Sequence, residues 1–258
     1  MIKPTRFLSI AAVALLSACG SDAGTGPNAS TPVNLATAFS EMSLPGLSAV
    51  ASLTGGVAAP TTSGVPSGCS YVAASQNFVC PSVTASGVTI TSNYALLDAS
   101  GHQMSTFDAN AVSALRVKST VVGTVTVSGD VLTIDGQQDQ TLSGLQTATH
   151  TLNGTNTLNF SGTLTSAAIP GPINTHSTTT ISNVVLPANG SATPYPTSGT
   201  VTVDQTTSLV GSASLTSRLV LTFNGTSKVA VALTLDGQTL PVCTIDLSKA
   251  LPSCSASI

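Results

Sequence analysis

The side chains able to do chemistry are few in this sequence. Of its 258 residues, three are histidines (His102, His150 and His176) and Glu41 is the one glutamate. No G-x-S-x-G nucleophile turn, H-E-x-x-H zinc motif or phosphate-binding loop occurs. A hydrolase triad could be assembled from His102 or His150, Asp98 and one of many serines, but no spacing selects one. We therefore predict a non-catalytic protein with no catalytic residue and no cofactor.

Metal binding has little support in the pattern of acidic residues. Asp130, Asp135 and Asp139 lie close together in the segment DVLTIDGQQD, which makes calcium a hypothesis for this stretch. The spacing does not match the calcium-binding EF-hand loop, however. Paired carboxylates for glycoside hydrolysis are also hard to assemble, because acidic residues are scarce and there is no aromatic platform for a sugar. We predict no resident metal.

Four cysteines form two near pairs, Cys69 with Cys80 and Cys243 with Cys254. Each pair is eleven positions apart and brackets a candidate hairpin, CSYVAASQNFVC or CTIDLSKALPSC. Four cysteines allow three pairings, and in an oxidising compartment we favour the two near pairs over the crossed alternatives. Each bond would stabilise the fold by roughly 2–3 kcal/mol. A four-cysteine zinc site is the other hypothesis, but such sites space their ligand pairs as C-x₂₋₄-C.

The fifth cysteine, Cys19, lies at the end of an N-terminal leader. Lys3 and Arg6 form a positive region, and residues 7–18 are an apolar core of twelve residues. That is the length of a signal-peptide core, and it is well short of the ~20 residues that a membrane-spanning helix needs. We predict that residues 1–18 are a signal peptide and that the chain is exported.

Leu16-Ser17-Ala18-Cys19 resembles the lipobox of bacterial lipoprotein precursors. The resemblance covers residues 1–20 and implies that the leader is cut before Cys19. It also implies that the Cys19 thiol carries diacylglycerol and that the new N-terminus is acylated, for example with palmitate. The alternative is an ordinary signal peptide that leaves Cys19 as a free thiol.

An acylated Cys19 makes membrane lipid the first partner of the protein. One acyl chain binds a membrane marginally, whereas two or more make release slow. By the sorting rule of many Gram-negative lipoproteins, Gly20 in place of an aspartate favours the outer membrane. Residues 19–31 are small and polar and predict a flexible tether.

The composition is typical of an exported, β-rich protein. Only 7% of the residues are charged and 3% are aromatic, yet 41% are hydrophobic, which argues against disorder. Threonine and valine are abundant, and their branched side chains favour extended chain. The net charge of −3 leaves no basic patch to neutralise phosphates, so we expect no nucleic-acid partner.

Two segments have features of short helices near the N-terminus. In residues 31–42, Thr31 is a candidate N-cap, Pro32 suits the first helical position, and apolar residues recur at roughly helical spacing. Residues 106–117 predict a second short helix capped by Thr106 or Asp108, with a loop over residues 108–115 as the alternative.

Most of the remaining chain alternates between apolar and polar residues, as strands do. Residues 87–101 and 217–238 are clear examples. Asn224-Gly225, Asp236-Gly237, Asp135-Gly136, Asn153-Gly154 and Asn189-Gly190 predict turns. We predict a mainly β fold: an antiparallel meander forming a curved sheet or a sandwich, in one domain over residues 32–258. The proline-rich residues 168–198 predict an irregular connection around one strand and could divide the domain in two.

The polar side of these strands carries threonine, serine and asparagine with hardly a charge. Thr-x-Thr pairs recur, for instance at Thr178/Thr180 and Thr200/Thr202, and cross-strand threonine pairs are a normal way to stabilise a sheet. An ice- or mineral-binding array is the alternative.

Together these features predict a lipid-anchored cell-envelope protein with a non-catalytic binding, structural or assembly role, whose further partner is an envelope protein. The alternative is a carrier of lipid or another apolar ligand, which would need an open apolar cavity.

Overall fold

The computed structural model describes residues 68–85, 87–127, 130–165, 171–187, 195–209, 214–240, 243–247 and 254–256. These residues form fifteen strands and no helix. The strands are β1 (Ser70–Val72), β2 (Asn77–Val79), β3 (Val83–Ala85), β4 (Val88–Leu97), β5 (Gln103–Met104), β6 (Ala114–Val127), β7 (Asp130–Ser143), β8 (Thr149–Leu164), β9 (Gly171–Pro187), β10 (Ser198–Leu209), β11 (Leu215–Thr222), β12 (Lys228–Leu235), β13 (Gln238–Thr239), β14 (Cys243–Asp246) and β15 (Cys254–Ala256).

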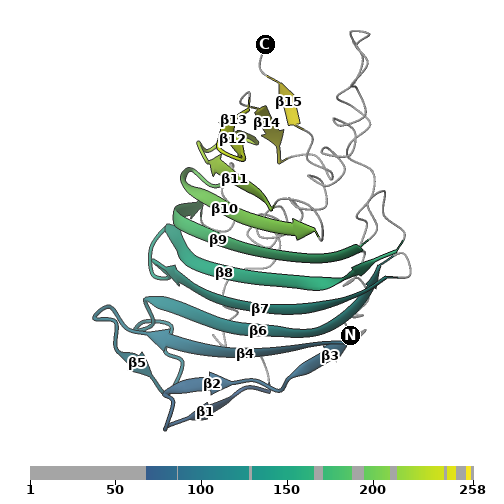
Figure 1. Ribbon diagram of the computed structural model, residues 1–258. Helices are drawn as coiled ribbons and strands as arrows, with labels where there is room; N and C mark the ends of the chain where they lie inside the picture. Colours follow the sequence, from purple (N-terminus) through teal and green to yellow (C-terminus); the bar gives the residue numbers. More distant parts are fainter. Residues whose placement is uncertain are drawn as a thin grey trace, which may run out of the picture.

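All fifteen strands belong to one antiparallel sheet, which is open and curved (Figure 1). The strands follow one another across the sheet in the order β1-β2-β4-β6-β7-β8-β9-β10-β11-β12-β14-β15, while β3 and β5 pair with β4 and β13 pairs with β12. Figure 1 shows the long central strands β6 to β10 bending along their length. The predicted antiparallel meander is confirmed, and of the two architectures the curved sheet is the one observed.

The alternation in the sequence correctly assigns residues to the two faces. In β4, Tyr94 and Leu96 lie on the face that contains the core, and Asn93 lies on the other. In β11, Leu219 and Leu221 are buried, with exposed Arg218 on the opposite side. We call the core-bearing side the inner face and the opposite side the outer face.

Two of the predicted turns are confirmed. Asn224-Gly225 lies between β11 and β12. Asp236 and Gly237 both have positive φ, 45° and 78°, and link β12 to β13. The register places Asn224 and Asp236 at strand ends, where the chain reverses.

Two other predicted turns are wrong. Asp135-Gly136 lies in the middle of β7, and Asn153-Gly154 lies within β8. Gly136 is buried, and a Cβ there would lie 2.9 Å from Cδ1 of Leu158, so a close approach to β8 explains this glycine better than a turn does. The turn predicted at residues 189–190 lies outside the described residues.

The second predicted helix, over residues 106–117, does not form, and the alternative prediction of a loop holds as far as Ser113. Residues 106–113 form a loop in which the amides of Ala111 and Val112 donate to the carbonyl oxygen of Asp108, at 3.0 and 2.9 Å. The Asp108 carboxylate accepts the amide of Asn110, so the residue caps one turn as a helix N-cap would. The chain then enters β6 at Ala114. The helix predicted over residues 31–42 lies outside the described residues.

The proline-rich region does not interrupt the sheet. β9 runs from Gly171 to Pro187 and pairs with β8 on one side and β10 on the other. Two of the prolines lie at or next to the ends of this strand, where the ladder does not need their missing amide hydrogens. A register shift falls at residues 182–184, where Asn183 has a φ of 50°.

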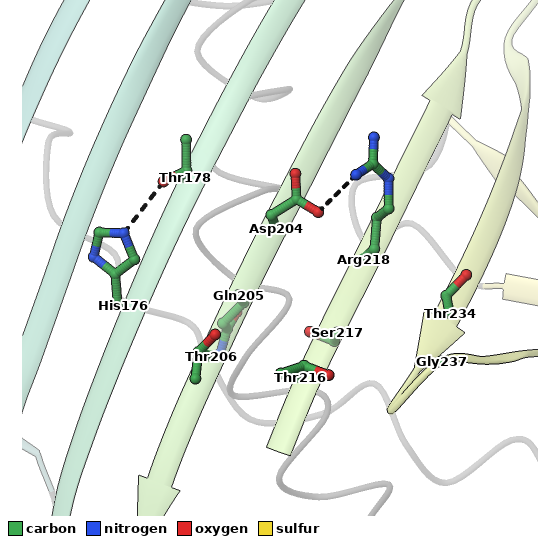
Figure 2. Close-up of a pocket in the computed structure, with 10 residues that line it drawn as sticks. All are labelled: His176, Thr178, Asp204, Gln205, Thr206, Thr216, Ser217, Arg218, Thr234 and Gly237. Atoms are coloured by element: carbon green, nitrogen blue, oxygen red, sulfur yellow. Dashed lines mark hydrogen bonds and ion pairs between the residues drawn. The ribbon is translucent and has the colours of Figure 1, made fainter. Parts of the chain in front are cut away.

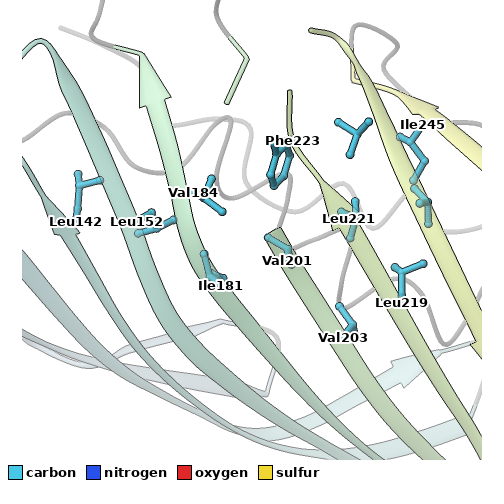
Figure 3. Close-up of a cluster of buried hydrophobic side chains, with 12 residues drawn as sticks. Leu142, Leu152, Ile181, Val184, Val201, Val203, Leu219, Leu221, Phe223 and Ile245 are labelled. Carbon is cyan, nitrogen blue, oxygen red and sulfur yellow. The ribbon is translucent and has the colours of Figure 1, made fainter. Parts of the chain in front are cut away.

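The core lies on the inner face in two clusters. Figure 3 shows the larger one, contributed by strands β7 to β14 and the residue after β11. Its members are Leu142, Leu152, Ile181, Val184, Val201, Val203, Leu219, Leu221, Phe223, Val229, Val231 and Ile245. The smaller cluster contains Leu96, Val112 and Leu115, and Leu145 packs against both. Four residues of the larger cluster (Val184, Val201, Leu221 and Val229) have no exposed surface.

A disulfide joins Cys69 and Cys80 across the ends of β1 and β2, as predicted. The amide of Cys80 donates to the carbonyl oxygen of Ser92 at 3.1 Å, which attaches this hairpin to β4. For the second predicted pair, the backbone register aligns Ile245 with Cys254 and Cys243 with Ala256. The two cysteines therefore lie on adjacent strands, and their disulfide stays a prediction.

Candidate functional site

The outer face carries a continuous row of polar residues across eight strands. Each member is the register partner of the next, so the row follows from the strand pairing alone. We call it the outer row, and its members from β4 to β12 are Thr91, Thr120, Gln137, Thr157, Thr178, Asp204, Arg218 and Thr234. With neighbouring strands about 4.8 Å apart, the row is about 34 Å long.

A shallow depression of ≈ 290 Å³ lies at the β9–β12 end of the outer row. Figure 2 shows His176 and Thr178 on β9, and Asp204 on β10 facing Arg218 on β11. The Arg218 guanidinium donates to Asp204 at 3.2 Å. The His176 ring contacts Asn159 through Nδ1 at 2.7 Å and Thr178 through Nε2 at 3.3 Å. Donors and acceptors of several kinds therefore border one open hollow.

A second depression of ≈ 440 Å³ lies at the β4–β8 end of the row. Arg116 binds the Asp139 carboxylate with both Nε and Nη2, at 2.7 and 2.6 Å, and Lys118 lies 3.5 Å from the same carboxylate. The Arg116 hydrogen bonds, followed by the positive charges of Arg116 and Lys118, hold the pKa of Asp139 below its ordinary value. Asp139 therefore stays ionised to a lower pH than a free aspartate, and it pairs with both cations.

The two depressions are adjacent. Thr157 lines the second, Thr178 lines the first, and these two residues are register partners on β8 and β9. The outer row therefore links both hollows into one polar strip. Amide and charged side chains interrupt the threonines, so the strip is not a uniform threonine lattice.

The chemistry of the strip suits binding. Arg218 and Arg116 are each engaged by a carboxylate, and His176 contacts an amide and a hydroxyl. Among the described residues, no hydrogen bond joins a histidine ring to a serine hydroxyl, the arrangement that activates a nucleophile. Exposed hydroxyls, amides and paired charges offer hydrogen bonds to a polar partner.

The residues that the hydrolase hypothesis would use do not meet at this strip. His102 lies in the turn between β4 and β5, where its Nδ1 is 3.5 Å from Asp98 and its side chain is 81% exposed. Asp98 shapes that turn by accepting the amides of Ser100 and His102 at 2.8 and 2.9 Å. The backbone hydrogen bond from His102 lowers the pKa of Asp98 most strongly. His150 lies on β8 opposite Leu186, three strands along the sheet from β4.

The calcium hypothesis for Asp130, Asp135 and Asp139 is wrong for this strand. β7 is extended over all three, so Asp130 and Asp139 are about 30 Å apart. Asp130 is 4% exposed and accepts the amide and hydroxyl of Thr165. Among the described residues, no group of three or more histidine, cysteine or acidic side chains is placed to hold a metal.

Arg116, Lys118 and Arg218 were not among the site residues predicted from the sequence. Each lies opposite a polar or acidic residue only because the strands pair in this register. The register partners are Thr141 for Arg116, Asp139 for Lys118 and Asp204 for Arg218. A basic residue on the polar side of an alternating segment was the available signal, because such a residue must point away from the core.

Comparison of the chain with protein-family models, with curated protein sequences and with solved structures finds no match. The part of the chain described by the structure holds no helix of sufficient length and apolarity to span a bilayer. Cys19 and the lipobox lie outside the described residues.

Proposed function

We propose that this protein is a lipid-anchored component of the cell envelope that binds a polar partner along its outer row. The lipobox at Leu16-Ser17-Ala18-Cys19 supports the anchor. The observation that carries the binding role is the strip itself: eight consecutive strands present polar side chains in register, with two depressions along them. A tether at residues 19–31 leaves such a surface free to meet a partner in the envelope.

The described side chains support a non-catalytic role. Binding through many exposed hydrogen bonds and paired charges needs a broad, shallow surface, whereas small-molecule sites are concave and mostly apolar. Both depressions are shallow and bordered by polar groups, among them Asp204, Arg218 and Asp139. Exposed ion pairs contribute little stability, so we propose that these charges serve recognition by orienting the partner.

Photo-crosslinking in the native envelope tests the binding role. A benzophenone amino acid replaces Thr178, in the middle of the outer row, and the control replaces Ser100, an exposed residue in the β4–β5 turn. We expect one dominant adduct from Thr178 and none from Ser100. An added Arg218→Glu substitution replaces the Arg218–Asp204 ion pair with two facing carboxylates. It should reduce the yield of the adduct from position 178. Equal labelling from both positions, or none from Thr178, would refute the role of the strip.

Fractionation tests the anchor separately. The wild-type protein should sediment with membranes and incorporate an alkyne analogue of palmitate, and Cys19→Ala should abolish both properties. A variant lacking the hairpin disulfide, Cys69→Ser/Cys80→Ser, is the matched control and should keep the label. Loss of the label in the control, or its retention in Cys19→Ala, would contradict lipidation at Cys19.

A carrier of lipid or another apolar ligand remains the second proposal. It is favoured by the extent of the apolar inner face, and it requires part of that face to be open. The larger core cluster argues the other way, since Val201 and Leu221 have no exposed surface. Displacement of a bound hydrophobic dye by lipid would support the carrier, and a protein that takes up no dye would exclude it.

A further inference from the structure

We infer that Arg218 is the point at which the outer row binds a carboxylate, and that this carboxylate belongs to an aspartate or glutamate side chain of a protein partner. The inference rests on the proposed binding role of the outer row and names the chemistry that the partner presents there. The carboxylate would bind at the depression that strands β9 to β12 border.

The two arginines of the outer face use their guanidinium groups differently. Arg116 binds Asp139 with Nε at 2.7 Å and Nη2 at 2.6 Å, so one whole edge of the group holds both oxygens of a carboxylate. Arg218 donates to Asp204 through Nη1, at 3.2 Å. Within the described part of the chain, Nε and Nη2 of Arg218 make no hydrogen bond. The edge that is filled in Arg116 is therefore open in Arg218.

The open edge of Arg218 is accessible from the depression. Figure 2 shows the guanidinium meeting Asp204 with one nitrogen, while its other nitrogens are turned away from that carboxylate. In the strand register Arg218 lies between Asp204 on β10 and Thr234 on β12. Its side chain is 58% exposed, and it lines the depression of ≈ 290 Å³. A group on a partner can therefore reach the open edge without breaking the contact with Asp204.

The geometry of that edge selects an oxyanion. Two parallel N–H groups fit the oxygens of a carboxylate or a phosphate, and a lysine ammonium does not reproduce this fork. The Arg116–Asp139 pair shows what this chain places against the same edge, which is a carboxylate. The open edge of Arg218 therefore predicts an oxyanion on the partner.

The acidic residues beside Arg218 favour a carboxylate over a phosphate. Asp204 already places one negative charge on the guanidinium. Asp236 accepts the amide and the hydroxyl of Thr216, at 2.7 and 3.1 Å, and so adds a second negative charge at the border of the depression. Repulsion grows with the charge of the ligand. A phosphate with two charges is therefore disfavoured more strongly than a carboxylate with one.

The rest of the outer face favours a protein as the source of the carboxylate. Its described residues on β4 to β12 include no phenylalanine or tyrosine, whereas sites for small ligands are lined mostly by hydrophobic and aromatic side chains. Oδ2 of Asp204 accepts no hydrogen bond from the described residues. One ion pair thus offers an open donor edge and an open acceptor oxygen, and a protein surface presents acceptors and donors side by side.

NMR of the arginine side chains tests the carboxylate site directly. The mature chain, residues 19–258, contains the two arginines Arg116 and Arg218, so labelling with ¹⁵N-arginine gives one Nε–H signal for each. The probes are a tetraglutamate peptide with blocked ends, tetragalacturonate with the same number of carboxylates, and inorganic phosphate, all at one ionic strength. We expect the peptide to shift the Arg218 signal at least about threefold more than the Arg116 signal. Phosphate and tetragalacturonate should shift the Arg218 signal less than the peptide does.

The NMR result can also refute the inference. Equal shifts of the two arginine signals would show that the open edge of Arg218 is not a preferred site. A larger Arg218 shift with phosphate would overturn the carboxylate, and a larger shift with tetragalacturonate would overturn a protein as its source.

Crosslinking in the native envelope separates failure of this inference from failure of the binding role. Arg218→Lys keeps the positive charge and removes the two-nitrogen edge, so it should reduce the adduct from position 178 at least about threefold. Lys228→Arg, on the same face of β12 as Thr234, is the matched exchange and should leave the adduct unchanged. A dominant adduct that Arg218→Lys does not reduce, or that both variants reduce equally, would overturn the carboxylate site and leave the binding role in place. Absence of any adduct from position 178 in the wild-type background would refute the binding role itself, and the inference with it.

Discussion

Replacing Leu221 with alanine tests whether the inner-face cluster is a packed core. Leu221 is fully buried at the centre of the larger cluster, on β11 between Val201 and Val231. The substitution removes three carbons, which at ~0.8 kcal/mol each give about 2.4 kcal/mol. The cavity left behind adds to this loss, so we expect the free energy of unfolding to fall by about 3 kcal/mol.

Urea denaturation followed by far-ultraviolet circular dichroism measures the loss, on the chain without its leader and with Cys19→Ser. With a slope near 3 kcal/mol per molar, the midpoint should fall by about 1 M. Thr222→Ala is the matched control, because Thr222 is the next residue on β11 and points to the exposed face. It should cost less than about 1 kcal/mol, the span of β-propensity. Equal losses from Leu221→Ala and Thr222→Ala would refute a packed inner face.

Two further predictions concern a glycine and an ion pair. Gly199 has a φ of 101°, and an added methyl would collide with the Asn183 backbone, whereas Gly101 has a φ of 82° with open space around it. Gly199→Ala should therefore lower the midpoint of thermal unfolding much more than Gly101→Ala does. Equal shifts of the midpoint would contradict the close contact between Gly199 and Asn183. Arg116 lowers the pKa of Asp139 in the folded protein. The stability that this ion pair provides is therefore fully present above about pH 3.9, the pKa of the carboxyl group in the unfolded chain. It is lost as the pH falls through the lower pKa of the folded protein. In a carboxyl-carbon NMR titration Arg116→Gln should raise the pKa of Asp139, and an unchanged value would contradict the assignment.

Alternation in the sequence was sufficient to predict the strands and the side to which their residues point. It identifies Leu219 and Leu221 as core residues because a strand with one buried face must repeat every second position. The Asn224-Gly225 turn could be predicted because both residue types favour chain reversals. In the structure Gly225 has a φ of 81°, and the Asn224 side chain accepts the amide of Thr226.

The same local signals failed where long-range pairing decided the outcome. Asp135-Gly136 has turn chemistry, but the ladder to β6 and β8 keeps it extended. The loop at residues 106–113 has an N-cap at Asp108, yet the chain must enter β6 at Ala114, so only one turn forms. Local preference gave way to the hydrogen bonds of the sheet in both places.

The candidate site could not be predicted because it depends on register. No sequence feature places Thr157 beside Thr178, or Asp204 beside Arg218, until strands of up to 17 residues are aligned. A row of polar residues on the inner face escaped prediction for the same reason. Only the register shows that Thr179 lies in line with Asn156, Gln138, Ser119 and Ser92 across β4 to β9.

The mass of the N-terminal peptide, measured on the protein isolated from its own host, tests the lipid anchor at Cys19. We expect a peptide that begins at Cys19 and carries a thioether-linked diacylglycerol, recovered from the membrane fraction. A peptide in which Cys19 is an unmodified thiol, or a protein recovered entirely from soluble fractions, would contradict the lipid anchor and the proposed placement of the sheet in the envelope.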